Sequence, residues 1–366
     1  MTHRFSTILL TIVLTAIGSI PSVAVQDDDG QVDLKALYQQ IDQAIEQFPE
    51  FVAEQEEIIN HSRQLFLSGS AGEEKLQTAE QLFNLFRSYK NDSALHYAKI
   101  CISLADSLHR PDLVGRYRSQ EARLCSNVGM YVESLALLQE VDKTTLDRQG
   151  LTKYYEAWMH VCGEIGSHSQ LNEVRLAYYE LQDAYRDSVL MVAETDSEEY
   201  LHLKMDVLNA RQQYQDALKV SNRWLNKVSD GTHEEAFAAF YRSVVYGKLA
   251  NHDLMRYWLG ISALNDIRCA VLDQAALVML AEHLGEDGDI ERAYRYISFS
   301  RDCNTTFHPH LRDYQVNSVI NVINKNAQEK QDINRCLTIW ATVMTCLFLT
   351  ALLCIFLILR RRNKKS

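Results

Sequence analysis

Short turn-like segments recur along this chain, and their spacing restricts the fold more than any other feature of the sequence. Each copy has a polar residue or a glycine, then an aromatic or aliphatic residue, and then a small residue three positions later. The clearest copies are residues 127–135, 211–218 and 288–294. In this register Ala217, Met255 and Ala293 lie 38 residues apart. A period of this length is typical of helix-turn-helix arrays, whose units bury their apolar faces only by stacking on one another.

The repeated positions have a packing role in such an array. A small residue at the start of a second helix lets it approach the first helix closely, and the larger residue before it fills the gap between neighbouring pairs. The residues for which we predict repeat packing are Gly129, Tyr131, Tyr214, Ala217, Met255, Gly288 and Ala293.

The composition agrees with a helical fold. The chain has 14 Gly and 4 Pro among 366 residues, less than half of the roughly 12% that is usual for these two residues together. β-Sandwiches, β-barrels and Rossmann-type enzymes use more of both in their turns and phosphate loops. The predicted fold class is therefore all-α, with a helical-repeat solenoid as its main part.

The helical period of the apolar residues predicts where the helices lie. Six pairs are expected at 76–108, 113–141, 151–187, 198–228, 233–267 and 270–303. An N-terminal helix covers 32–68, and Pro49 is expected to break or kink it. Gly69 to Gly72 reads as a flexible linker, and a last helix is expected at about 311–335.

The first 24 residues have the features of a secretory signal peptide. Arg4 provides the positive charge, residues 5–17 form a short apolar core, and Ser22 and Ala24 are the small residues before a cleavage site. The alternative is an uncleaved membrane anchor. After this segment, residues 25–72 form the N-terminal helices and linker, and the repeats occupy 73–310.

An uncharged segment near the C-terminus, 336–359, predicts a single transmembrane helix. Its 24 residues extend about 36 Å as a helix, compared with roughly 30 Å of bilayer hydrocarbon. The connecting helix 311–335 precedes it, and the basic tail 360–366 follows it. Because a basic cluster marks the cytoplasmic side, we expect a type I topology with the bulk of the chain outside the cytoplasm.

The charges and cysteines describe the exported part, residues 25–335. Removing one positive charge in the signal segment and five after residue 335 from the net charge of −11 leaves −17 for this part. Such an acidic surface disfavours direct nucleic-acid binding by this chain. Its five cysteines are expected to be buried free thiols, and a single bridge between Cys101 and Cys125 is the alternative.

The repeats resemble the tetratricopeptide repeat (TPR), whose turn pattern is best matched at 129–135 and 214–218. The whole order of segments is also similar to a Bacteroidetes family of membrane-anchored TPR proteins described as transmembrane transcriptional regulators. The stretches that carry this similarity are DSALHYA at 92–98, AYRDS at 184–188, SALNDIR at 262–268 and GDIERAYRY at 288–296.

The resemblance covers about 33–362 and implies a sensor in the inner (cytoplasmic) membrane with its repeats in the periplasm. Family members continue into a cytoplasmic coiled coil and a helix-turn-helix DNA-binding segment. Only seven residues follow residue 359 here, so the expectation is a sensor without the DNA-binding output.

No catalytic, metal or cofactor motif is present in the sequence, so we predict a non-enzymatic protein that needs no cofactor. The closest His and Cys pairs, His308 with His310 and His160 with Cys162, have no evident third ligand. Aromatic and arginine side chains at helical spacing are candidates to contact a protein or peptide ligand on the concave face. These candidates are Arg116, Tyr117, Arg123, Tyr154 and Trp158. The alternative role for the aromatic ones is packing between helices.

Two further partners follow from the C-terminal segment. Residues 336–359 would contact the lipid bilayer, and Thr338, Thr342 and Thr345 lie on one face of the helix, where they could support a homodimer. Alternatively, these hydroxyls bond to their own backbone. The predicted function is ligand sensing by a single-pass regulator, and the alternative is a structural scaffold for envelope complexes without signalling.

Overall fold

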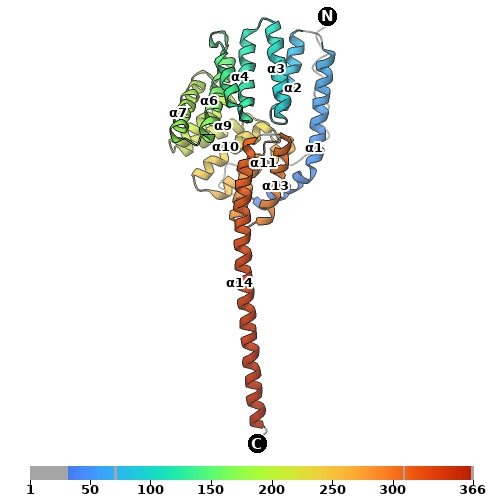
Figure 1. Cartoon of the computed structure of the whole chain (residues 1–366), viewed down its shortest axis with the longest axis vertical. Coiled ribbons are helices and arrows are strands. Elements are labelled where there is room, and N and C mark those ends of the chain that lie inside the picture. Colours follow the sequence, from blue (N-terminus) through green and yellow to red (C-terminus); the bar gives the residue numbers. More distant parts are fainter. Residues whose placement is uncertain (1–31, 70–71, 308–309, 364–366) are drawn as a thin grey trace. The chain divides into compact units, whose positions relative to one another are not determined.

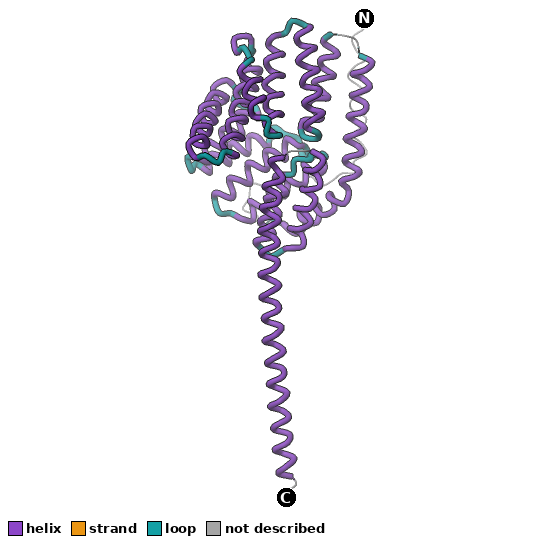
Figure 2. The backbone as a smooth tube through the Cα atoms, in the orientation of Figure 1, coloured by secondary structure: helices purple, strands orange, loops and turns teal. Residues whose placement is uncertain are grey.

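The computed structural model describes residues 32–69, 72–307 and 310–363, and within these ranges the chain is helical (Figure 2). The predicted signal peptide, 1–24, lies outside the described residues. The described part contains fourteen α-helices and one short 3₁₀ helix. The predicted all-α, TPR-like solenoid with one apolar C-terminal helix is therefore confirmed.

Six consecutive helix pairs form the repeats (Figure 1). They are α2 (Glu73–Arg87) with α3 (Asn91–Ser107), α4 (Pro111–Asn127) with α5 (Tyr131–Gln139), α6 (Arg148–His168) with α7 (Asn172–Val192), α8 (Glu198–Ala210) with α9 (Tyr214–Leu225), α10 (His233–Lys248) with α11 (His252–Arg268), and α12 (Ala275–Glu286) with α13 (Ile290–Phe307). The 3₁₀ helix η2 (Lys143–Thr145) separates α5 from α6.

The repeated small residue is buried where the second helix begins. Ala217, Met255 and Ala293 are each the fourth residue of their helices and are buried, as is Ser134 in α5. Ala94 occupies the same position in α3, although the sequence pattern did not single it out. A bulky side chain fits at this position only where the facing helix leaves room, as Gly247 of α10 does for Met255.

Six of the helix ends share one turn geometry. The second residue after the helix has a positive φ at His109, Gly129, Gln212, Ala250, Ala270 and Gly288. The next amide then donates to the carbonyl oxygen five residues back, for example Met130 to Cys125 and Asp289 to Leu284. This is the Schellman arrangement, which satisfies the last carbonyl groups of a helix and favours glycine. It explains the roles of Gly129 and Gly288 in the repeated turn.

The N-terminal helix α1 (Leu34–Ser68) continues through Pro49, so of the predicted break or kink the break does not occur. A proline inside a helix costs one backbone hydrogen bond and a steric clash, about 3 kcal/mol. Burial on both sides of the proline opposes this cost. Ile41 lies in the core formed with α11, and Ile59 lies in the core formed with α2 and α3.

Helix α1 also contacts α13, so it joins the first pair to the last. Asp42 accepts a charged hydrogen bond from Arg292 at 3.1 Å, and the Tyr296 hydroxyl donates to the Tyr38 carbonyl oxygen at 3.2 Å. The rings of Phe48 and Phe299 meet edge-on at 4.9 Å between centroids. In Figure 1 one end of α1 accordingly lies beside α11 and α13.

The last helix, α14 (His310–Asn363), unites the predicted connecting helix and the predicted span. Ile323 is buried against Gly285 of α12, whereas the side chains of residues 331–350 are exposed. Within the described residues, Gln331–Thr350 is long and apolar enough to cross a membrane. The hydroxyls of Thr338, Thr342 and Thr345 each donate to the carbonyl four residues back, at 2.8 Å. This geometry is the alternative to a Thr-mediated homodimer.

The cysteines of the repeats are free thiols. Cys101, Cys125, Cys162 and Cys303 are buried, and burial raises the pKa of each thiol. Cys101 and Cys125 do not form the bridge that the sequence left open.

Candidate ligand-binding surface

Charged and aromatic groups from the first helices of five consecutive pairs interact with one another. We call these groups the inner charged cluster: Arg87 of α2, Arg123 of α4, Glu156 of α6, Glu198 and His202 of α8, and Glu234 and Tyr241 of α10. The charges of Arg123, Glu156 and Glu198 all act on Arg87, and that of Glu234 acts on Glu198. The first helices of five repeats therefore bring their charges together on one side of the array.

Two arginines supply the positive charge of this cluster. The side chains of Arg87 and Arg123 are exposed, and neither forms a hydrogen bond or an ion pair with another described residue. Yet the surrounding protein lowers the pKa of Arg87, first by removing water from it and then through the charge of Arg123. The Arg87 guanidinium thus reaches solvent while protein limits its hydration, which strengthens the attraction of an anionic ligand group.

The acidic residues of the cluster are held around the start of α8. Ser197 caps this helix by accepting a hydrogen bond from the Tyr200 amide. Lys153 of α6 bridges Glu156 at 2.9 Å and Glu199 at 2.6 Å. Burial alone would raise the pKa of Glu199, but the ion pair with Lys153 outweighs it and lowers the pKa to about 2.

Glu198 has a different environment from its neighbour. Burial, and then the charge of Glu199, raises the pKa of Glu198, and the charge of Arg87 opposes that change. Glu199 is therefore neutralised locally by Lys153, whereas Glu198 can respond to a ligand that approaches the arginines.

An aromatic group adjoins the charged side chains. The ring of His202 lies 6.2 Å from that of Trp224, 5.6 Å from that of Phe237 and 5.3 Å from that of Tyr241. Burial lowers the pKa of His202, so this imidazole is neutral at pH 7, and its Nδ1 lies 3.0 Å from the Glu198 carbonyl oxygen. Arginine, carboxylate and aromatic groups in one place can bind a ligand that has charged and apolar parts.

Among the five candidates from the sequence, Arg123 is the one in this cluster. Arg116 instead joins three first helices, since it donates to Glu80 of α2 at 2.7 Å and to Gln149 of α6 at 2.8 Å. Tyr117 is 1% exposed and lies under the Arg116 guanidinium, 4.9 Å from its centre. Both side chains hold neighbouring repeats together.

Tyr154 and Trp158 both belong to α6, and their rings pack against neighbouring side chains. Tyr154 is buried, with its ring edge-on to Trp158 at 6.4 Å. Trp158 stacks on Tyr185 of α7 at 5.2 Å. These contacts match the packing role that the sequence left open, and ligand contact by any of the five residues stays a prediction.

Two cluster residues that the sequence analysis missed, Arg87 and Glu156, lie at about one repeat length from the predicted Arg123. Arg87, Arg123 and Glu156 follow one another at 36 and 33 residues, close to one repeat length. Glu156 is charged yet buried, and it lies between Tyr154 and Ala157, which are also buried. A search for charged residues at repeat spacing on the first helices would have found this row.

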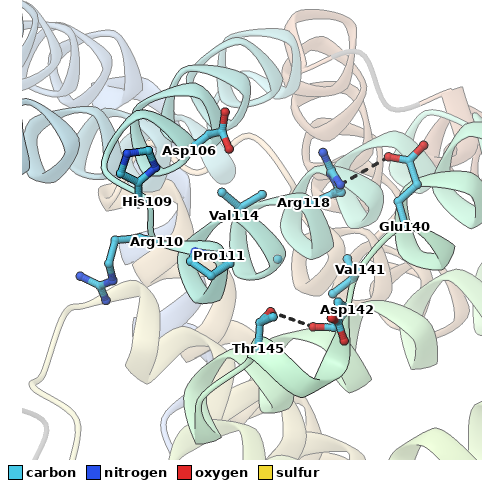
Figure 3. Close-up of a pocket in the computed structure, with 11 residues that line it drawn as sticks. Asp106, His109, Arg110, Pro111, Val114, Arg118, Glu140, Val141, Asp142 and Thr145 are labelled. Carbon is cyan, nitrogen blue, oxygen red and sulfur yellow. Dashed lines mark hydrogen bonds and ion pairs between the residues drawn. The ribbon is translucent and has the colours of Figure 1, made fainter.

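A second surface feature is the hollow between the α3–α4 turn and the η2 segment, with a volume of about 380 Å³ (Figure 3). Its two arginines and Glu140 already have partners. Arg110 donates to Asp112 at 3.0 Å and 2.7 Å, and Arg118 lies 3.4 Å from Glu140. A ligand there would have to displace these pairs, so the inner charged cluster is the better candidate.

Comparison with known families identifies the repeats. Residues 45–318 match the family described as the SusR N-terminal TPR domain, and this match covers most of the chain. The chain belongs to this family. SusR-type proteins are regulators of the Bacteroidetes, so the resemblance found in the sequence is confirmed at the level of the TPR domain. No curated protein matches the chain at a significant level. In the SusR-type domain, no group of three or more His, Cys, Asp or Glu side chains among the described residues could hold a metal ion.

Proposed function

We propose that this chain is the sensory part of a SusR-type transmembrane regulator and that it binds its ligand on the inner charged cluster. Membership in a regulator family supports the regulatory role. The observation that carries the binding site is the interaction of Arg87, Arg123 and Glu198 across three repeats. The ligand would be a protein, a peptide or a fragment of the cell envelope, and no catalytic step is involved.

A structural change at the binding surface can reach the C-terminal helix through the packing of neighbouring pairs. A ligand that joins α2, α4 and α8 would change the spacing of neighbouring pairs, because each pair packs on the next. The last pair packs on α14 through Ile323 and Gly285, and α14 continues into the apolar segment. We propose that this segment crosses the inner membrane, with the repeats in the periplasm, and carries the change inward.

The binding site can be tested on the full chain in detergent. Panels of peptides and soluble envelope fragments are screened for compounds that raise its melting temperature, because a ligand that binds the folded state stabilises it. The Arg87→Ala/Arg123→Ala variant should bind each hit at least tenfold more weakly. The control, Lys219→Ala, changes an exposed cation of α9 and should bind normally. Equal binding by both variants would place the site elsewhere.

The exposed apolar face of α7, described below, favours a second candidate: a scaffold that holds other envelope proteins without signalling. A transcriptional reporter fused after Ser366 separates the two functions. A sensor changes reporter output when a hit is added, and the double arginine variant abolishes this response. A scaffold gives constant output with every hit.

A further inference from the structure

Helix α7 exposes most of its apolar side chains. Val189 is its one buried residue, whereas Leu176 is 60% exposed, Leu181 is 45% exposed and Met191 is 83% exposed. Soluble surfaces carry scattered apolar residues, but a row of them along one helix marks an interaction site.

Six residues of α7 follow the spacing of a helix–helix seam, and Leu176 is not among them. Val174, Ala177, Leu181, Ala184, Ser188 and Met191 alternate steps of three and four, as core positions of a coiled coil do. We call these six residues the α7 seam. All are exposed except Ser188, which is half-buried. The two alanines let a partner helix approach closely between the larger side chains.

A different side of α7 packs within the chain, so the α7 seam is not needed for the fold. Tyr185 stacks on Trp158 of α6, and Val189 is buried. Gln182 and Tyr179 lie against Gly163 and Gly166 of α6. The repeat fold is therefore explained by this side, and the seam is left for another molecule.

The charge of the residues beside the α7 seam determines which kind of partner can bind there. Glu173, Glu180 and Asp187 run beside the seam at intervals of seven residues, and all three are exposed. The neighbouring basic residue Arg186 is already paired with two acidic residues, with Asp183 at 2.6 Å and with Asp187 at 3.6 Å. The flank of the seam is therefore predominantly negative.

A second copy of the chain fits this flank poorly. In an antiparallel pair of α7 helices the acidic row would face the same row of the other copy, and like charges at flanking positions destabilise a coiled coil. The net charge of −11 adds repulsion over longer distances. A helix with Lys or Arg beside its apolar seam would instead pair with Glu173 and Glu180.

We propose that the α7 seam docks a basic amphipathic helix of another protein. The docked helix packs apolar side chains around Ala177 and Ala184 and pairs its flanking cations with the acidic row. This surface is separate from the inner charged cluster, so partner docking and ligand binding can be lost independently.

The test uses two synthetic 21-residue helical peptides that both repeat Leu and Ala at seam positions. One has Lys at every flanking position and the other has Glu. Binding to the full chain in detergent is measured by fluorescence anisotropy. The Lys peptide should bind at least tenfold more tightly than the Glu peptide, and Glu180→Lys combined with Asp187→Lys should reverse this preference.

A pair of apolar variants locates the binding. Leu181→Glu should weaken the Lys peptide at least tenfold, whereas Val132→Glu, a matched change at an exposed residue of α5, should leave binding unchanged. Because both side chains are exposed, melting temperatures should stay within a few degrees of the parent. Equal binding of the two peptides, binding of neither, or a dimer that Leu181→Glu dissociates would overturn the proposal.

Discussion

Helices α7 and α11 are both second helices of a repeat pair, yet their surroundings are opposite. In α11 every residue from Trp258 to Ile267 is buried, whereas in α7 only Val189 is. The difference comes from what covers them. Helix α11 packs against α10, α1 and α12, while α7 packs mainly against α6. Burial in this array is thus decided by the helices added to a repeat, not by the position within it.

Helix α1 is the additional helix that covers α11, so α11 must be apolar on more than one side. A helix covered on one side needs one apolar stripe, but α11 has buried Leu259, Ile261 and Leu264 pointing in different directions. Gly260 lies against Leu37 and Ile41 of α1. Helix α7 has no such cover, and its outward side chains are free to serve a partner.

The largest expected effect on stability distinguishes a buried side chain of α11 from an exposed side chain of α7. Leu259→Ala should lower the free energy of unfolding by about 3 kcal/mol, because it removes a fully buried side chain. Leu176→Ala in α7 removes an exposed one and should change it by less than about 0.5 kcal/mol. Urea titration of the full chain in detergent measures both. Similar losses for the two variants would mean that α7 is covered as well as α11.

Glycine variants test how closely the helices approach. A Cβ at Gly260 would lie 2.6 Å from Leu37 Cδ2, inside the packed core, so Gly260→Ala should cost about 1–2 kcal/mol. A Cβ at Gly163 would lie 2.6 Å from Gln182 Nε2, the end of a flexible side chain that can move away. Gly163→Ala should therefore be neutral or slightly stabilising, since alanine favours helix. The reverse order in urea titration would contradict the close approach of α1 to α11.

The pH dependence of stability tests the neighbourhood of α7. Burial raises the pKa of Asp206 in α8 to about 6, and Arg186 of α7 only partly opposes this. An unfolded Asp titrates near 3.9, so the folded chain binds this proton more tightly and gains stability as the pH falls from about 7 to 4. Asp206→Asn should stabilise by about 1 kcal/mol at pH 7.5, and the gain should vanish near pH 4. An equal effect at both pH values would show that Asp206 is well hydrated.

The smallest effect concerns helix ends. Helix α10 is followed by Ala250 at φ 56°, and α4 is followed by Gly129 at φ 80°. Helix α7 is instead followed by an extended residue, Ala193. A left-handed residue other than glycine costs about 1 kcal/mol. Ala250→Gly should therefore stabilise by about 0.5 kcal/mol, and Gly129→Ala should destabilise by about 1 kcal/mol. Thermal unfolding checks both, and Ala193→Gly, which should not stabilise, is the control.

The repeats were predictable because each one carries its own local signal. The turn glycines and the small residues at Ala217 and Ala293 report the packing of a helix on its own partner, which is close in sequence. The path of α1 was not predictable in this way. Its contacts join residues about 250 positions apart, such as Asp42 and Arg292, and no repeat pattern records them. Pro49 also suggested a break or a kink, and burial on both sides of it favours a continuous helix.

The sequence predicted a ligand surface made of arginine and aromatic side chains, but it did not predict most of the residues of the candidate site. Helical spacing led to Tyr154 and Trp158, whose rings pack between helices, because aromatic residues mark cores and ligand surfaces alike. Arg123 was found, but Arg87, on which its charge acts, belongs to the preceding repeat pair, and Glu198 belongs to a pair two repeats further along. Which first-helix residues face one another depends on the stacking of the pairs, and a single repeat does not specify that.

Hydrogen exchange on the full chain in detergent tests the central claim, that α1 closes over the last repeats while α7 stays uncovered. Protection reports the free energy of local opening. The structure predicts that amides of α1 between Leu37 and Phe48 exchange as slowly as those of α11, and that α7 exchanges faster than either. Rapid exchange of α1, as expected for a loose N-terminal helix, together with slow exchange of α7 would contradict the account.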